Sequence, residues 1–219
     1  MNELILFLQL LLIITFALLA TRWGKEALCA LVVVQVLLAN LFVLKQIDLF
    51  SFHVTSSDAF AIGSMIALNL LQEYYGKESA KKAIKLSFAF MVFFAMVSQV
   101  HLFYQPSVLD TAHPAYAQLL APAPRLLLAS LLTFFIVQQF DTRLFSTLKE
   151  KFTKVPFWSR NFLSIALSQL LDTALFTLLG LYGLIGSLFD IFIVSFALKC
   201  LIALSLTPIA TLSKKFIKA

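Results

Sequence analysis

Charged residues, cysteine and flexible linkers are scarce in this sequence. Only 13% of its 219 residues are charged, and no stretch is rich in glycine and serine. The two cysteines, Cys29 and Cys200, fall inside apolar segments, so they indicate neither a disulfide framework nor a metal site. No loop is long enough to form a separate domain, and we therefore expect one domain over residues 1–219.

Enzyme motifs are missing as well. The chain has no phosphate-binding GxxxxGKS/T loop, no HExxH pair and no GxSxG elbow. It therefore offers neither a site for ATP hydrolysis nor a recognisable nucleophile, and we expect no enzymatic activity and no cofactor. His101 and His113 stand too far from any cysteine or acid cluster to indicate a set of metal ligands.

Apolar residues dominate what is present. They make up 61% of the chain, which includes 23 phenylalanines, and the mean hydropathy is +0.94. Because soluble domains do not reach such values, the composition predicts an integral membrane protein. A helix needs about 20 residues to cross the hydrocarbon core of a bilayer. We expect an all-α bundle of about seven transmembrane helices, at about residues 4–20, 26–44, 57–75, 84–104, 125–147, 160–182 and 186–212.

The basic residues fall on alternate loops, so the net charge of +6 is a topology signal and does not indicate a nucleic-acid-binding patch. The positive-inside rule places the first, third and fifth loops and the C-terminus in the cytoplasm, and seven spans then place the N-terminus outside. Glu3 stands where a signal peptide has basic residues, so we expect the first segment to remain as a helix. The basic residues on the cytoplasmic side are Arg22, Lys25, Lys77, Lys81, Lys82, Lys85, Lys149, Lys151, Lys154, Arg160, Lys214, Lys215 and Lys218.

Polar residues recur inside the apolar segments at helical spacing. Asn69, Gln72 and Glu73 follow each other at i, i+3 and i+4, which places them on one face of the third helix. Each such group needs a partner, because lipid offers no water. Glu73 lies near the cytoplasmic end, where a charge can also reach the interface. Further polar positions are Ser168, Gln169, Asp172 and Thr173 in the sixth segment, Gln138, Gln139 and Asp141 in the fifth, and Asn40 in the second.

Asp172 and Lys199 lie near the centres of the last two segments. A charge at this depth costs roughly 3 kcal/mol on insertion scales, so it normally faces a partner or a water-filled pathway. At 1.5 Å per residue, Asp172 is roughly 18 Å beyond Arg160, and Lys199 is roughly 22 Å from Lys214 on the same side. We therefore expect the two side chains to meet. They indicate a carrier, or alternatively a structural ion pair with the amides as interhelical contacts.

Several short sequence boxes stand in a defined order between about Trp23 and Lys215: Leu38-Ala39-Asn40, Val43-Leu44-Lys45, Glu73-Tyr74-Tyr75-Gly76-Lys77, Ala80-Lys81-Lys82, Pro124-Arg125, Ser159-Arg160-Asn161, Ser168-Gln169-Leu170-Leu171-Asp172-Thr173, Lys199 and Thr207-Pro208. In their order and spacing, these boxes resemble the queuosine precursor transporter family, also called the vitamin uptake transporter family. The resemblance implies a carrier in the bacterial inner membrane that imports a 7-deazaguanine, either a pre-queuosine base or queuine, for salvage into tRNA. It also implies a six-helix core, about residues 26–212, similar to the substrate-binding subunits of energy-coupling-factor importers, with the first helix as an addition.

A guanine-like edge presents adjacent N–H donors that a carboxylate accepts as a pair. Asp172 is our candidate for this task, or else Glu73, and Lys199 would orient Asp172 or contact the base. Asn69 and Phe196 stand where many family members have Asp and Tyr, so the family pattern leaves open which base is carried. The predicted substrate contacts are Asp172, Gln169, Lys199, Glu73, Asn40, Asn69, Gln139 and Arg125.

Three functions remain open from the sequence. In the first, the chain is a solitary carrier of a deazapurine. It then needs no ATPase partner and makes no direct contact with nucleic acid, and it acts as a monomer or as a homo-oligomer. Alternatively, it is a binding subunit that needs an ATPase partner, or a carrier of another small heterocycle. In the third case it is a membrane enzyme or assembly factor with a structural polar core.

Overall fold

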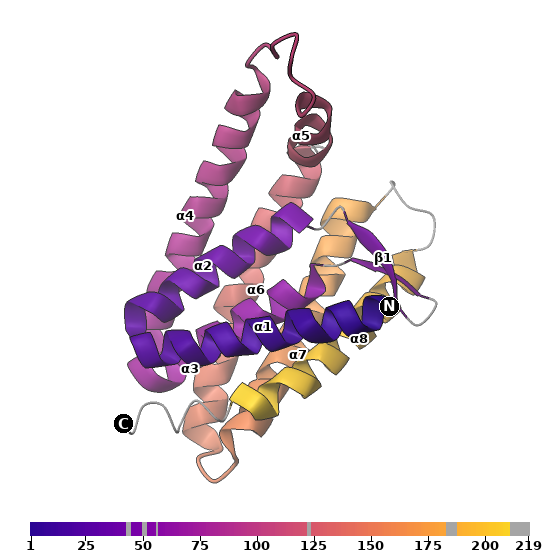
Figure 1. Cartoon of the computed structure of the whole chain (residues 1–219). Coiled ribbons are helices and arrows are strands. Elements are labelled where there is room, and N and C mark those ends of the chain that lie inside the picture. Colours follow the sequence, from indigo (N-terminus) through magenta and orange to yellow (C-terminus); the bar gives the residue numbers. More distant parts are fainter. Residues whose placement is uncertain (43–44, 50–51, 56, 122–123, 183–187, 211–219) are drawn as a thin grey trace.

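The computed structural model describes residues 1–42, 45–49, 52–55, 57–121, 124–182 and 188–210. These residues form eight α-helices, one π-helical turn and one β-hairpin (Figure 1). The helices are α1 (Asn2–Trp23), α2 (Lys25–Phe42), α3 (Asp58–Tyr75), α4 (Lys77–Leu102), α5 (His113–Leu120), α6 (Pro124–Lys151), α7 (Phe157–Phe176) and α8 (Leu188–Ala210). The π-helical turn η1 (Thr177–Leu181) continues α7, and the strands are β1 (Gln46–Leu49) and β2 (Phe52–Thr55).

Each of the seven apolar segments coincides with one long helix. Among the described residues, four helical stretches are long and apolar enough to cross a membrane by length and composition: Asn2–Trp23, Lys25–Phe42, Lys77–Leu102 and Phe157–Gly180. The helical character of the membrane protein is thereby confirmed. The short helix α5 was not predicted, and it lies within the proline-containing connection between α4 and α6.

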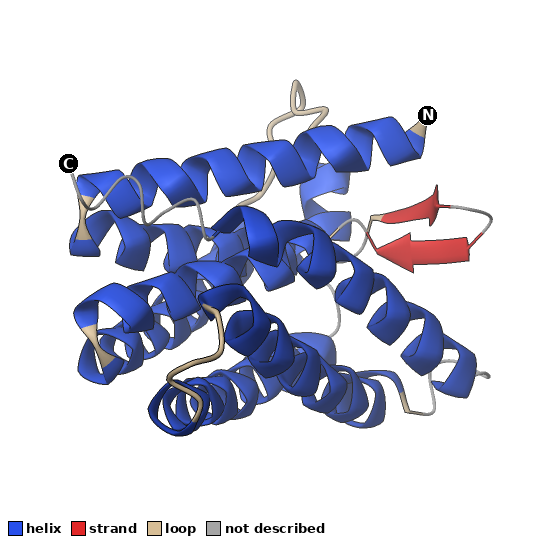
Figure 2. Ribbon diagram, turned by 90° about the horizontal axis from the view of Figure 1, so that it is seen from below, coloured by secondary structure: helices blue, strands red, loops and turns tan. Residues whose placement is uncertain are grey.

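One short β-hairpin, which was not predicted, accompanies the helices. The connection between α2 and α3 contains an antiparallel hairpin in which Gln46 pairs with Thr55 and Leu49 with Phe52. The sequences Gln-Ile-Asp-Leu and Phe-His-Val-Thr alternate polar and apolar residues, which is typical of strands. Figure 2 shows the hairpin at one side of the bundle, and Asn2 Nδ2 donates a hydrogen bond to Asp48 O at 2.9 Å, which joins β1 to the start of α1.

The connection between α3 and α4 was predicted to be a basic loop, but it consists of Gly76 alone. α4 begins at Lys77, seven residues before the expected start at 84, so Lys81, Lys82 and Lys85 lie on its first turns. Lysine and glutamate are good helix formers, and a helix does not have to end where the apolar segment ends. Lys81 Nζ also lies 2.7 Å from Glu78 Oε1, an i, i+3 pair that favours the helix at this position.

A single glycine joins α1 to α2, and another joins α3 to α4. Gly24 has φ +105° and Gly76 has φ +81°, a region that only glycine adopts readily. Their N–H groups close the preceding helices by donating to Ala20 O at 3.0 Å and to Gln72 O at 3.1 Å. A Cβ atom on Gly24 would lie 3.9 Å from Tyr75 Oη, so both joints lie at the same end of the molecule.

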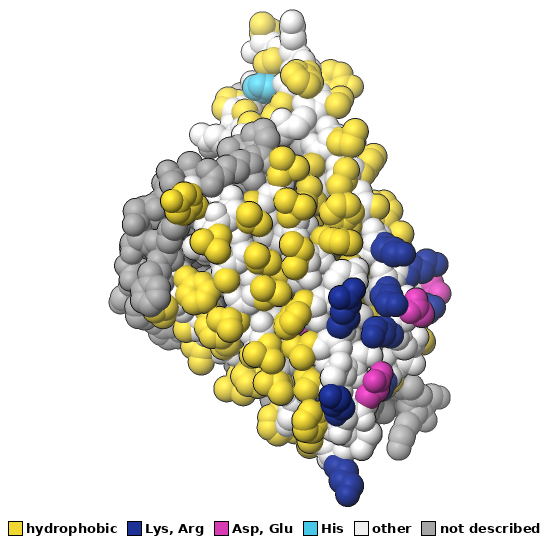
Figure 3. Space-filling view, turned by 180° about the vertical axis from the view of Figure 1, so that it is seen from behind, with side chains coloured by type: hydrophobic (Ala, Val, Ile, Leu, Met, Phe, Trp, Pro, Cys, Tyr) yellow, Lys and Arg dark blue, Asp and Glu magenta, His cyan; other side chains and the backbone are white. Residues whose placement is uncertain are grey.

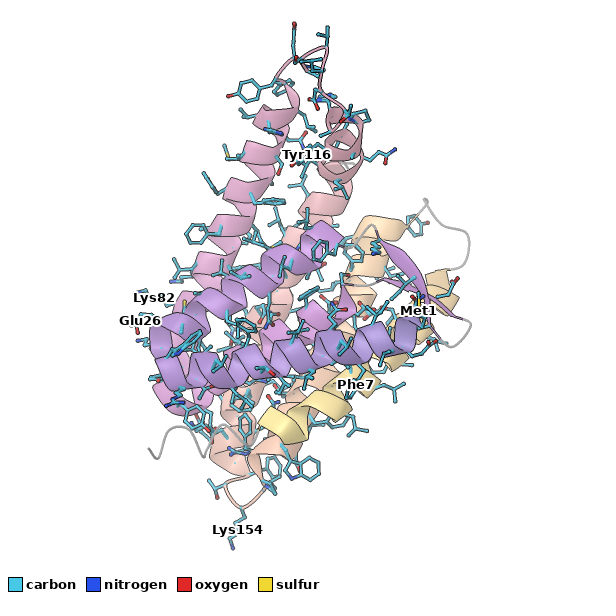
Figure 4. All side chains as sticks on the ribbon, viewed as in Figure 1. Met1, Phe7, Glu26, Lys82, Tyr116 and Lys154 are labelled. Atoms are coloured by element: carbon cyan, nitrogen blue, oxygen red, sulfur yellow. The ribbon has the colours of Figure 1, made fainter. Side chains whose placement is uncertain are left out.

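The end of α6 meets the same end of the bundle, because Lys149 Nζ donates to Glu73 O at 2.8 Å. The connections predicted to share one side of the membrane therefore lie together. Figure 3 shows Lys and Arg side chains gathered toward one end of the visible face, with apolar side chains over most of the remainder. In Figure 4, Lys154 marks this end and Tyr116 of α5 marks the opposite end.

α3 is the central helix, in contact with α1, α2, α4, α6, α7 and α8. Thirteen of its 18 residues are buried, and α1 lies across it in Figure 1. Gly63 permits this close packing, since a Cβ atom there would lie 2.7 Å from Ile13 Cγ2 and 2.5 Å from Gln35 Oε1. Polar residues on α3 are therefore enclosed by protein and not exposed to lipid.

Candidate functional site

A column of polar side chains follows the interface between α3 and α7. Gln169 Nε2 lies 2.9 Å from Met65 Sδ, and Asn69 Nδ2 donates to Asn161 Oδ1 at 2.7 Å. The numbers rise along α3 as they fall along α7, so the helices are antiparallel. We call this set the polar column, and its members are Asp58, Asn69, Gln72 and Glu73 on α3, Asp141 on α6, Arg160, Asn161, Ser164, Ser168, Gln169, Asp172 and Thr173 on α7, and Lys199 on α8.

Lys199 joins the column at the end remote from the basic residues. Its Nζ lies 2.6 Å from Asp172 Oδ2 and 3.4 Å from Thr173 Oγ1, which confirms the predicted meeting of Asp172 and Lys199. A second carboxylate is close, because Asp58 Oδ1 lies 4.0 Å from the same Nζ. The side chains of Lys199 and Asp58 are 8% and 9% exposed, whereas that of Asp172 is 24% exposed. Asp172 is therefore the accessible carboxylate of the three-residue cluster.

The sequence alone does not single out Asp58 as a site residue. It is the first residue of α3, where an acid is ordinarily explained by its favourable interaction with the helix N-terminus. Its contact with Lys199 depends on the packing of α3 against α8, two helices more than a hundred residues apart in the chain. Only its position at the edge of an apolar segment signalled that it would be enclosed by protein.

Asp141 occupies the middle of the column. It is fully buried, and its Oδ1 accepts hydrogen bonds from Ser164 Oγ at 2.6 Å and Ser168 Oγ at 2.9 Å. These hydroxyl groups come from two successive turns of α7, so a single carboxylate joins α6 to α7. Hydrogen bonds to an ionised acceptor are roughly twice as strong as neutral ones.

At the basic end, the column finishes in an ion cluster. Arg160 Nη2 lies 3.4 Å from Glu73 Oε1, and Lys149 Nζ lies 3.4 Å from Glu73 Oε2. One residue earlier, Gln72 Nε2 donates to Thr142 O at 3.1 Å. Gln72 and Glu73, like Asn69, therefore make interhelical contacts, with partners on α6 or α7.

Three predicted site residues are not among these contacts. The described contacts of Asn40 are with Val36 O, Met91 Sδ and Ser130 Oγ, on α2, α4 and α6. Gln139 is half-buried, while its neighbour Gln138 is almost fully buried. The side chain of Arg125 lies outside the described part of the structure.

Residues 57–213 match the family model described as "Putative vitamin uptake transporter". The chain belongs to this transporter family. A relative from Bacillus subtilis (strain 168), named "Probable queuosine precursor transporter", is 31% identical over 198 residues, which cover 89% of this chain and 86% of the relative. No solved structure matches the chain. The transporter is thus a multi-pass helical membrane protein, and the matched residues include the whole polar column but neither α1 nor α2.

The transporter has a cavity of about 380 Å³ between α2, α3 and α4, away from the Asp172 cluster. Glu26 and Lys82 line it and lie close together in Figure 4, with Cys29, Val33 and Phe90 among the other lining residues. A smaller cavity of about 30 Å³ adjoins Asn40, Ser98 and Gln99. Neither of these two cavities borders Asp172 or Lys199.

Metal ligation has no support in the described residues of the transporter, where no three His, Cys, Asp or Glu side chains converge to hold an ion. The chemistry of the column is instead hydrogen bonding and charge. The accessible carboxylate of Asp172 lies one helical turn from Gln169, whose Oε1 is buried without a hydrogen-bond partner in the described part of the chain. The column therefore offers two acceptors on one face of α7.

Proposed function

We propose that this transporter imports a queuosine precursor, a 7-deazaguanine such as a pre-queuosine base or queuine, across the bacterial inner membrane for salvage into tRNA. The name of the Bacillus subtilis relative supports the substrate class. The observation that carries the proposal is the partly exposed carboxylate of Asp172, held deep in the bundle beside a buried lysine. A mid-membrane charge of this kind commonly marks a substrate pathway.

The chemistry of the substrate fits these acceptors. The ring N–H and the exocyclic amine of a guanine-like base are adjacent donors, and a carboxylate accepts both with defined geometry. In our proposal Asp172 accepts this pair, Gln169 Oε1 accepts a further N–H group, and Lys199 orients Asp172 before the base binds. Asn69 and Glu73 line the same column toward the basic end, and Asn40, Gln139 and Arg125 are retained as more distant candidates.

We propose that all seven long helices cross the membrane, with α1 added to a core of six over about residues 26–212. α3 carries four residues of the column and is enclosed by its neighbouring helices, so a less uniformly apolar composition does not prevent it from crossing the membrane. The basic end faces the cytoplasm, as does the C-terminus, and the N-terminus is outside. In a variant lacking Cys29 and Cys200, a cysteine at Lys154 should resist a membrane-impermeant thiol reagent in intact cells, whereas one at Asp110 should react. The reverse result would contradict this orientation.

The decisive experiment is Asp172→Asn. We expect uptake of radiolabelled base to fall to background while the protein still inserts, because the amide puts a donor where the base needs an acceptor. Asp110→Asn is the matched control, since Asp110 lies in an exposed loop, and it should keep uptake unchanged. Normal uptake by Asp172→Asn would contradict the proposed role.

Reconstitution distinguishes the alternatives. Purified protein in liposomes should move the base unaided if it is a solitary carrier, and only together with an ATPase if it is a binding subunit. No movement in either case would indicate a structural polar core. Binding of the two pre-queuosine bases and of queuine, measured side by side, should identify the preferred base.

A further inference from the structure

Lys199 lies between two carboxylates that belong to different helices. Asp172 on α7 holds its ammonium group at 2.6 Å, and Asp58 on α3 lies 4.0 Å away on the buried side. Asp58 Oδ2 is itself buried and has no hydrogen-bond partner in the described part of the structure. Asp172 is therefore the partly exposed carboxylate that already binds Lys199, and Asp58 is a buried carboxylate that can still accept a hydrogen bond.

We propose that Asp58 is the alternate counter-ion of Lys199, which receives the ammonium group when the transported solute binds to Asp172. This inference rests on the proposed function in one respect, namely that Asp172 receives the solute. It assigns to Asp58 a positioning role, because the residue acts on the solute only through Lys199.

Electrostatics require such a partner. A buried ammonium group without a counter-ion is strongly unfavourable, so the solute cannot free both oxygens of Asp172 unless Lys199 gains another carboxylate. The distance is small, since a shift of about 1 Å would bring Nζ from 4.0 Å to hydrogen-bond distance of Asp58 Oδ1. Lysine has a flexible four-carbon side chain, and Thr173 Oγ1, at 3.4 Å from Nζ, is a further acceptor for the ammonium group.

The charges of the cluster give the exchange its direction. Among the described residues, two carboxylates share one ammonium group, so a transfer of Lys199 to Asp58 leaves Asp172 as a free anion. A free anion at this position accepts the N–H donors of a base and attracts a cationic substituent. When the solute departs, the ammonium group returns to Asp172 and closes the site.

The first test needs no substrate. The melting temperatures of detergent-purified Asp58→Asn, Asp172→Asn and the double variant are compared, with Asp110→Asn as control. Each single variant keeps one counter-ion for Lys199, so we expect modest shifts, whereas the double variant should lose more than the sum of the two shifts. Adding Lys199→Met to the double variant should restore most of that loss. Additive shifts, or no restoration by Lys199→Met, would overturn the proposal.

The second test measures binding of the base by calorimetry. We expect Asp58→Asn to bind at least tenfold more weakly than the unaltered protein, because the ammonium group then stays on Asp172. Asp58→Asn combined with Lys199→Met should bind at least threefold more tightly than Asp58→Asn alone, because no ammonium group competes for Asp172. Unchanged affinity of Asp58→Asn, or no gain in the combined variant, would overturn the proposal.

The two tests separate the two levels of inference. If the unaltered protein binds no base but the melting temperatures are non-additive, the proposed substrate is wrong and Asp58 remains the second counter-ion. If the base binds and the melting temperatures are additive, the proposed function stands and the role of Asp58 is refuted.

Discussion

Replacing Ser164 and Ser168 together by alanine should destabilise the transporter through a third residue, Asp141. The two hydroxyl groups are the described donors to Asp141 Oδ1, at 2.6 Å and 2.9 Å, and the carboxylate is fully buried. Without these hydroxyl groups, the carboxylate of Asp141 stays buried but loses its described hydrogen bonds. The double variant therefore tests whether the polar column stabilises the bundle through a buried charge.

The expected magnitude follows from the type of hydrogen bond. Neutral interhelical hydrogen bonds in membrane proteins average about 0.6 kcal/mol, whereas bonds to charged groups contribute about 1.5–3 kcal/mol each. Since the two bonds share one oxygen atom, we expect a combined loss of about 3 kcal/mol in the free energy of unfolding. The loss is measured by equilibrium unfolding in mixed detergent micelles.

A matched control is available on α4. Ser87 is also fully buried, but its hydroxyl group has no hydrogen-bond partner within the described residues, so Ser87→Ala should be neutral or slightly stabilising. Asp141→Leu added to the double variant should recover stability, because it removes the buried charge. A loss below about 1 kcal/mol in the double variant, or no recovery with Asp141→Leu, would refute the reasoning.

Further predictions concern the glycine joints and the basic end. Gly76→Ala should lower the free energy of unfolding by about 2 kcal/mol, although no atom lies within 4 Å of the added Cβ, because φ +81° is strained for alanine. Gly63→Ala should cost about 1–3 kcal/mol by steric overlap with side chains of α1 and α2, and a normal melting temperature would contradict the packing described here. Glu73→Gln should cost about 2 kcal/mol, because the nearly buried Arg160 loses a carboxylate partner, whereas the exposed Glu78→Gln should leave the melting temperature almost unchanged.

Much of the helical architecture could be predicted from the sequence, because a long apolar segment in a membrane protein has few alternatives to a helix. The spacing of Asn69, Gln72 and Glu73 predicted one polar face. The number of residues that separate Asp172 and Lys199 from the basic residues at the cytoplasmic side predicted that the two reach a similar depth. Both predictions depend only on the regular geometry of a helix.

The remaining features depend on tertiary packing, which helical geometry alone does not determine. Nothing in the local sequence reveals that Asp58 approaches Lys199 or that Asp141 faces two serines of α7. The start of α4 was misplaced because charge marks the membrane surface and not the end of a helix. The hairpin after α2 was missed because strands of four residues give a weak periodic signal beside long apolar helices.

The antiparallel register of α3 and α7 has a consequence for movement. From Met65 to Glu73, α3 advances about 12 Å, and from Arg160 to Gln169, α7 advances about 14 Å, so the two outer of their three contact levels are nearly equally far apart on both helices. If one helix slid along the other, all three contacts would break together. We therefore expect these helices to travel as one rigid body during transport, and the relative displacement that admits and releases the solute to occur at α8.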